Sequence, residues 1–235
     1  MNMSKKLILS ILILLSYLFS QFKNEELIYD VEIKKGIFPS IKVGKCNLKV
    51  DMTDEKHYKM KIITQTNSTS NFFYSYFDSI ELLLDNDFSL LDIGHITISN
   101  KKKTEKYANI DKDTKSIFSN GKKLNFYNDN LFSPYSLIYF LRTQDFKTHE
   151  TYNYKIFDGK KIKNILLKVL NIEKIKVPYG TFKCFHVTPN NKKIIQNNTV
   201  LEIWYTNDKD KKPIQIKLKS KIGTITMKLK KIIQK

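Results

Sequence analysis

Histidine, cysteine and acidic side chains are the groups in this 235-residue chain that could do chemistry, and they are scattered. The histidines are His57, His95, His149 and His186. None of them has a second His, Cys or acid at the spacing of a metal motif such as HExxH. Asp78 and Glu81 are close in sequence, but an offset of three along a strand puts two side chains on opposite faces. We therefore predict neither a metal site nor a catalytic carboxylate pair.

Cys184 and His186 are two residues apart and share one face of an expected strand, an arrangement that would suit a thiolate–imidazole pair. We interpret them as packing residues, because an isolated pair of this kind usually packs. The chain has seven glycines and contains no GxSxG elbow, glycine-rich phosphate loop or dinucleotide fingerprint. The sequence therefore predicts no catalytic and no cofactor-binding residues, and a protein that is not an enzyme.

The two cysteines, Cys46 and Cys184, allow two interpretations. An exported chain meets oxidising surroundings, where they could pair. Such a disulfide would close most of the chain and stabilise it by roughly 4 to 5 kcal/mol in the chain-entropy model. Two free, buried thiols are the alternative.

The N-terminus has the pattern of a secretory signal peptide. Lys5 and Lys6 precede an apolar run over residues 7–19, and the small residue Ser20 follows. The run is too short to cross a bilayer core, which needs about 20 residues. We predict a signal peptide over residues 1–20 that is cleaved after Ser20, no transmembrane segment after its removal, and a soluble product. Neither cysteine lies near that junction, so no thiol is available there for lipid attachment.

Period-two alternation dominates from residue 25 onward and predicts half-buried β-strands. In the first strand, Leu27, Tyr29 and Val31 share one face and Asp30 and Glu32 the other. About a dozen strands follow one another with connections too short for crossover helices, so the sheet is expected to be mainly antiparallel. No Pro-, Gly- or Ser-rich linker divides the chain. We predict one all-β domain over residues 21–235, built as a curved sheet or open barrel.

One segment, residues 134–142, is predicted to be a helix instead. Ser133 is suited to cap its free amides, and Pro134 suits the first helical position. Apolar residues then recur at spacings of three and four. Because an apolar helix face must be covered, we expect the sheet to wrap this helix.

The charge of the chain is +18, and loss of Lys5 and Lys6 would lower it by two. Arg142 is the single arginine and Ala108 the single alanine, while Lys, Asn and Ile abound, which is the residue set that AT-rich codons produce. The lysines are then a solvated outer face. The alternative is electrostatic attraction to an anionic surface such as lipid headgroups. We expect no nucleic-acid partner, since no recognised motif for one is present.

Several segments together resemble a bacterial exported family of unknown function, numbered 3108. They are residues 133–143, 177–184, 201–208 and 214–227, with an opening strand around residues 27–31. The resemblance covers nearly the whole chain after the signal peptide. It implies an exported protein of bacteria with an outer membrane, built as a curved antiparallel sheet or barrel. It implies no established activity and no catalytic residues.

Two functional hypotheses follow. The first is a periplasmic, non-enzymatic envelope protein that binds an apolar or amphipathic, lipid-like ligand in a cavity lined by Leu137, Phe140 and Trp204. In the second, the helix fills the sheet, and the protein is a structural or protein-interaction scaffold of the envelope with no small ligand. The expected partners are a lipid or an envelope protein, and the chain is expected to be a monomer.

Overall fold

The computed structural model describes residues 24–54, 56–71, 75–126, 130–190, 200–220 and 223–234. The predicted signal peptide, residues 1–20, lies outside these ranges. The strands are β1 (Glu25–Lys34), β2 (Ile41–Asp54), β3 (His57–Thr66), β4 (Tyr76–Asp85), β5 (Leu90–Ser99), β6 (Lys102–Asp111), β7 (Ser116–Ser119), β8 (Lys122–Asn125), β9 (Thr151–Phe157), β10 (Ile162–Val177), β11 (Gly180–Pro189), β12 (Val200–Thr206), β13 (Pro213–Ser220) and β14 (Gly223–Gln234). The helices are α2 (Ser68–Asn71), α3 (Pro134–Phe140) and the 3-10 helix η1 (Leu141–Thr143).

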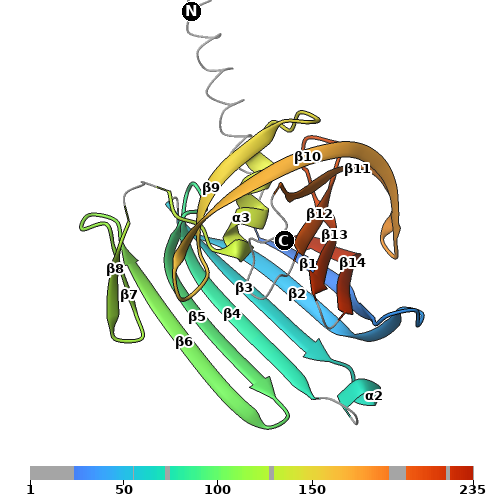
Figure 1. The fold of residues 1–235 in the computed structure, drawn as a ribbon, viewed down its shortest axis with the longest axis horizontal. Coiled ribbons are helices and arrows are strands. Elements are labelled where there is room, and N and C mark those ends of the chain that lie inside the picture. Colours follow the sequence, from blue (N-terminus) through green and yellow to red (C-terminus); the bar gives the residue numbers. More distant parts are fainter. Residues whose placement is uncertain are drawn as a thin grey trace, which may run out of the picture.

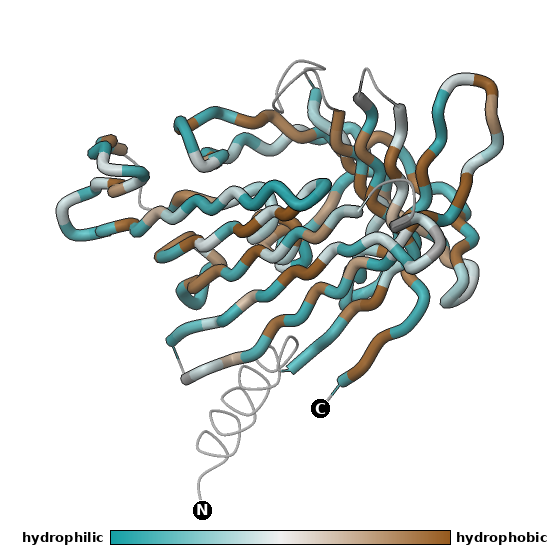
Figure 2. The backbone as a smooth tube through the Cα atoms, turned by 90° about the horizontal axis from the view of Figure 1, so that it is seen from below, coloured by the Kyte–Doolittle hydropathy of each residue, from teal (hydrophilic) through white to brown (hydrophobic). Residues whose placement is uncertain are grey.

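Alternation of apolar and polar side chains produces the strands. Leu27, Tyr29 and Val31 are buried on one face of β1, and the hydropathy colours alternate along the strands in Figure 2. In the described part of the chain, all 14 strands form one antiparallel sheet, which confirms the predicted all-β class. The short strand β8 was not predicted, because its sequence Lys-Lys-Leu-Asn carries one apolar residue and no period.

The sheet is organised around β1, which pairs with β2 on one side and β14 on the other. The first and last strands therefore lie side by side, with Glu25 opposite Gln234. From this pair, one series of strands runs from β2 to β8 and the other from β14 to β9. The sheet curves so that the second series arches over the first (Figure 1).

A bridging segment, residues 131–132, joins these two series at the end of the curve. The Leu90 amide donates to the Leu131 carbonyl at 2.7 Å, at the start of β5. One residue later, the Phe157 amide of β9 donates to the Phe132 carbonyl at 2.8 Å. The sheet itself stays open, and residues 131–132 connect its edge strand β9 to β5.

Helix α3 begins directly after this segment and lies on the concave side of the sheet (Figure 1). The Ser133 hydroxyl accepts from the Ser136 amide at 2.9 Å, and the Ser136 hydroxyl accepts from the Ser133 amide at 3.0 Å. This capping box, with Pro134 in the first turn, fixes the start of the helix. The predicted helix and its enclosure by the sheet are confirmed. We call α3 and η1 together the plug.

Gly44 offers a test of the packing between β2 and β3. A Cβ atom at this position would lie 2.2 Å from the Gln65 backbone oxygen, which cannot move without shifting the strand. Gly44→Ala should therefore lower the free energy of unfolding by about 1 to 3 kcal/mol in urea denaturation. Gly94→Ala is the matched control, since its Cβ would meet the movable Tyr107 ring at 3.2 Å. Equal losses in both variants would contradict this account.

Candidate functional site

A small apolar hollow lies between the plug and the sheet. Its volume is about 20 Å³. It is lined by Pro134, Leu137, Ile138, Leu141, Ile156, Ile165, Leu167, Val187, Leu201 and Ile203. A space of this size holds one water molecule, whereas ligand pockets enclose about 300 to 1,000 Å³. The hollow is thus too small for an acyl chain while the plug stays in place.

Of the three predicted lining residues, only Leu137 borders this hollow. The Phe140 ring packs on Phe132 and Tyr154, with centroid distances of 4.5 and 5.5 Å. Trp204 follows Ile203, which lines the hollow, so its side chain lies on the opposite face of β12. The three residues are therefore not gathered around one cavity.

Trp204 belongs to a separate cluster on the outer face of the sheet. Its indole N–H donates to Glu173 at 2.5 Å, and its ring stacks on His186 at 4.3 Å. His186 Nδ1 also lies 3.2 Å from Glu173. Burial lowers the pKa of His186 from its ordinary value, although Glu202 and Glu173 act to raise it. The buried His186 Nε2 has no hydrogen-bond partner among the described residues, which agrees with a neutral ring.

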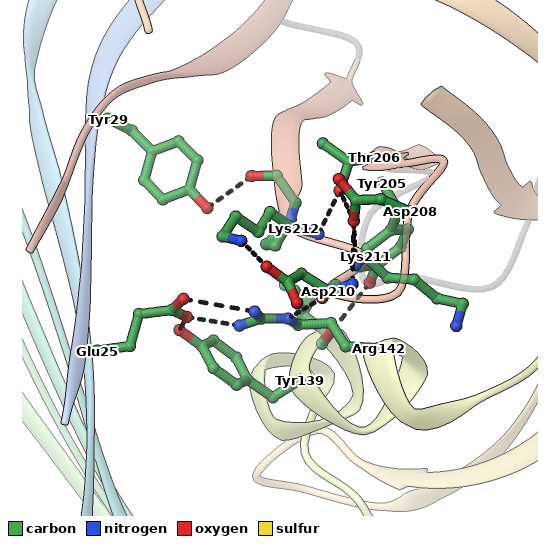
Figure 3. Close-up of polar contacts among 12 residues, drawn as sticks. Glu25, Tyr29, Tyr139, Arg142, Tyr205, Thr206, Asp208, Asp210, Lys211 and Lys212 are labelled. Carbon is green, nitrogen blue, oxygen red and sulfur yellow. Dashed lines mark hydrogen bonds and ion pairs between the residues drawn. The ribbon is translucent and has the colours of Figure 1, made fainter. Parts of the chain in front are cut away.

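A buried ion pair joins the plug to the first strand (Figure 3). Arg142 Nη1 lies 2.5 Å from Glu25 Oε2, and both side chains are 1% exposed. The Tyr139 hydroxyl donates to the same oxygen at 2.9 Å, and the Arg142 guanidinium lies 4.9 Å from the Tyr139 ring centroid. Arg142 Nε donates to the Asp210 carbonyl at 3.1 Å. We call Glu25, Tyr139, Arg142 and the Asp210 carbonyl the lock.

Residues around the lock fix the β12–β13 turn against the plug (Figure 3). The Tyr205 hydroxyl donates to the Ile138 carbonyl at 3.0 Å, and the Tyr29 hydroxyl donates to the Pro213 carbonyl at 2.8 Å. The Asp208 carboxylate accepts from the Asp210 amide at 3.0 Å and so shapes the turn that presents the Asp210 carbonyl. Burial raises the pKa of Tyr29 and Tyr205 well above the ordinary value, which keeps both hydroxyls as neutral donors.

The lock was not predicted from the sequence. Arg142 is the chain's single arginine in a lysine-rich protein, and it follows the apolar helix. That contrast was the available signal, because a guanidinium binds a carboxylate through two parallel hydrogen bonds and an ammonium does not. In the lock these donors and acceptors bind one another. The arrangement therefore holds the plug in place.

A second polar cluster lies on the inner face of β4 and β5. Asp78 accepts from the Thr97 hydroxyl at 2.7 Å, and His95 Nε2 lies 2.8 Å from the same oxygen. Burial alone would raise the pKa of Asp78, but the hydrogen bonds from His95 and Thr97 outweigh it and lower this pKa. Asp78 is thus held as an ionised acceptor. Among the described residues, no group of three or more His, Cys, Asp or Glu side chains is placed to hold a metal ion.

Both cysteines are free and buried, so the disulfide considered above is not formed. Their strands explain this. Cys46 pairs with Tyr29 in the core of the concave face, whereas Cys184 pairs with Thr206 on the outer face with His186. Burial raises the pKa of the Cys46 thiol to about 11 and that of Cys184 to about 12. Cys184 is therefore a thiol, which supports its interpretation as a packing residue.

Comparison with known proteins gives a family and a fold. Residues 28–230 match the family model described as "Protein of unknown function (DUF3108)". The chain is similar to a beta-barrel-like protein of the domain of unknown function DUF1849 from Brucella abortus, with 10% identity, a TM-score of 0.63, and coverage of 91% of this chain and 98% of that one. A DUF1089 family protein from Pseudomonas aeruginosa has 9% identity, a TM-score of 0.43, and coverage of 77% and 92%. No curated protein matches the sequence.

The family match confirms the family resemblance, and the similarity to the Brucella structure confirms the barrel-like, all-β fold. The Brucella protein shares the fold alone, at an identity too low to transfer a function. Among the described residues, no helix has the length and apolar character needed to span a membrane.

The lock predicts that removing one partner of the ion pair destabilises the fold more than removing both. Arg142→Met should lower the free energy of unfolding by about 3 to 5 kcal/mol, because it leaves the Glu25 carboxylate buried and unpaired. The double variant Glu25→Leu/Arg142→Met should recover much of that loss in urea denaturation. Lys219→Met, which breaks the exposed pair with Glu202, is the control and should cost less than about 1 kcal/mol. Additive losses in the double variant would contradict this role.

His186 predicts a pH dependence of stability. The unfolded chain protonates this residue near its ordinary pKa of 6.5, whereas burial keeps the folded-state pKa lower. As the pH is lowered through 6.5, the unfolded state takes up more protons than the folded state. The free energy of unfolding should therefore decrease as the pH is lowered, by at most about 1.4 kcal/mol per pH unit. Urea denaturation between pH 7.5 and 5.5 should show a shallower slope for His186→Gln. An unchanged slope would reject the assignment, and the exposed His149→Asn is the control for loss of a histidine.

Proposed function

The chain belongs to the DUF3108 family of proteins of unknown function, and on that premise we propose that it is an exported, non-enzymatic scaffold of the bacterial cell envelope. The observation that carries the scaffold role is the small size of the hollow between the plug and the sheet. The plug leaves about 20 Å³ beneath it, and the lock fixes it to β1 and to the β12–β13 turn.

Export is supported by the predicted signal peptide over residues 1–20, and its destination in such bacteria is the periplasm. The non-enzymatic role is supported by the side chains most suited to chemistry. The Cys184 thiol has a raised pKa, Asp78 accepts from Thr97, and the Glu25 carboxylate pairs with Arg142. Each of these groups has a structural use in the fold.

A lipid-like ligand is the second candidate function, and the composition of the hollow favours it. Its lining residues are all apolar, including Leu137 from the plug and Ile203 from the sheet. An acyl chain would need the plug to move outward, which requires breaking the buried ion pair. Because removing one partner of such a pair is costly, we favour the scaffold.

Native mass spectrometry separates the two functions. The mature chain, beginning at residue 21, is purified without detergent and incubated with an extract of envelope lipids. The scaffold proposal expects the bare mass of the chain, because a hollow of about 20 Å³ cannot hold an acyl chain. A stoichiometric lipid-sized adduct would overturn it. Leu137→Phe, which fills the hollow, is the matched variant, and an adduct lost in this variant would locate the lipid beneath the plug.

A further inference from the structure

The tip of the β1–β2 hairpin presents neighbouring apolar side chains to solvent. Ile37 is 96% exposed, Phe38 68% and Ile41 61%. The other exposed large apolar residues in the described part of the chain are Leu83, Tyr107, Phe118, Ile172 and Tyr179, which are between 39% and 55% exposed and lie on different strands or turns. Single exposed residues need no explanation, but a contiguous apolar tip marks an interaction site.

The backbone holds this tip in an outward conformation. The Phe38 amide donates to the Lys35 carbonyl at 3.2 Å, and Gly36 supplies the positive φ of +56° that this turn needs. At its base, the Ser40 hydroxyl donates to Glu32 at 3.0 Å. The hairpin projects at the edge of the molecule (Figure 1). In this conformation Ile37 and Phe38 are exposed to solvent.

Lysines flank the tip, and the tip itself carries no acid. Residues 33–44 contain no Asp or Glu, but they contain Lys34, Lys35 and Lys42. Lys34 and Lys35 are exposed and flank the turn directly. The nearest acids on β1 are already engaged, since Asp30 pairs with Lys42 at 2.8 Å and Glu32 with Lys228 at 2.7 Å. The tip thus combines an exposed apolar end with flanking positive charges.

We propose that this tip docks on an anionic lipid bilayer, with Ile37 and Phe38 entering the interface and Lys34 and Lys35 at the level of the phosphates. Apolar side chains flanked by cations are what binds proteins to the surface of anionic membranes. A protein partner fits less well. A stable protein interface buries more than about 1,000 Å² in total, and a narrow hairpin end offers a small fraction of that area.

The site lies far from the lock and does not depend on it. Glu25 and Lys34 are at opposite ends of β1, which at 3.3 Å per residue separates them by about 30 Å. Membrane docking goes beyond the scaffold role, since it names the surface on which the protein works. It would also hold if a ligand were found beneath the plug.

Vesicle co-sedimentation tests the proposal. The mature chain should sediment with vesicles of phosphatidylglycerol and phosphatidylcholine, less with phosphatidylcholine alone, and less in high salt. Ile37→Ser/Phe38→Ser should weaken partitioning onto the anionic vesicles by about tenfold or more. Phe118→Ser is the matched control, because that ring is 48% exposed and also has a lysine, Lys123, 5.4 Å from its centroid. It should bind as the wild type does.

A fluorescent variant reports insertion directly. Phe38→Trp adds one exposed indole to the buried Trp204, and its emission should shift to shorter wavelength when anionic vesicles are added. Three results would overturn the proposal. They are no binding of the wild type to anionic vesicles, equal binding of the wild type and Ile37→Ser/Phe38→Ser, and a lipid-free dimer in sedimentation that this double variant abolishes. The tip is solvent-exposed, so thermal melts of its variants should match the wild type.

Discussion

The arrangement of the interior depends on the buried ion pair between Glu25 and Arg142. It joins the first residue of β1 to the end of the plug, and the Asp210 carbonyl adds the β12–β13 turn to the same guanidinium. Burying two charges costs several kcal/mol each, so the pair is tolerated because both carboxylate oxygens and three guanidinium nitrogens have partners. If the plug packed at a different position on the sheet, these two charges would be buried without a partner. The ion pair therefore selects one packing of the helix against the sheet.

The small size of the hollow beneath the plug directs the search for function to the outside of the molecule. Small ligands bind in pre-formed cavities of several hundred Å³, and the hollow beneath Leu137 is far smaller. Loops and turns held by a rigid sheet are the usual place for function in such a fold. The exposed Ile37 and Phe38 are the most distinctive feature of that kind among the described residues.

The sequence predicts strands and the plug well, because each has a local signal. Alternation identifies β1, and Ser133 and Pro134 identify the start of α3. Contacts between residues that are distant in sequence are harder to predict. Period two says that Ile203 and Trp204 point to opposite faces, and the polar neighbour Glu202 shares the face of Trp204. That parity was a readable sign that Trp204 lies on the outer face. The pairing of Glu25 with Arg142, 117 residues apart, left no local pattern beyond the rarity of arginine.

Lysine and arginine occupy different environments in this chain, in line with their different chemistry. Lysine is a strongly hydrated point charge, and here it occupies solvated positions such as Lys34 and Lys35, where water or anionic headgroups can reach it. Arginine is more weakly hydrated and has a planar set of donors, and the chain uses it once, where a cation must be buried beside a carboxylate and under Tyr139. A codon bias toward lysine explains the first distribution and not the second. At this position the guanidinium makes two hydrogen bonds to the buried carboxylate, which a lysine ammonium cannot make in the same parallel geometry.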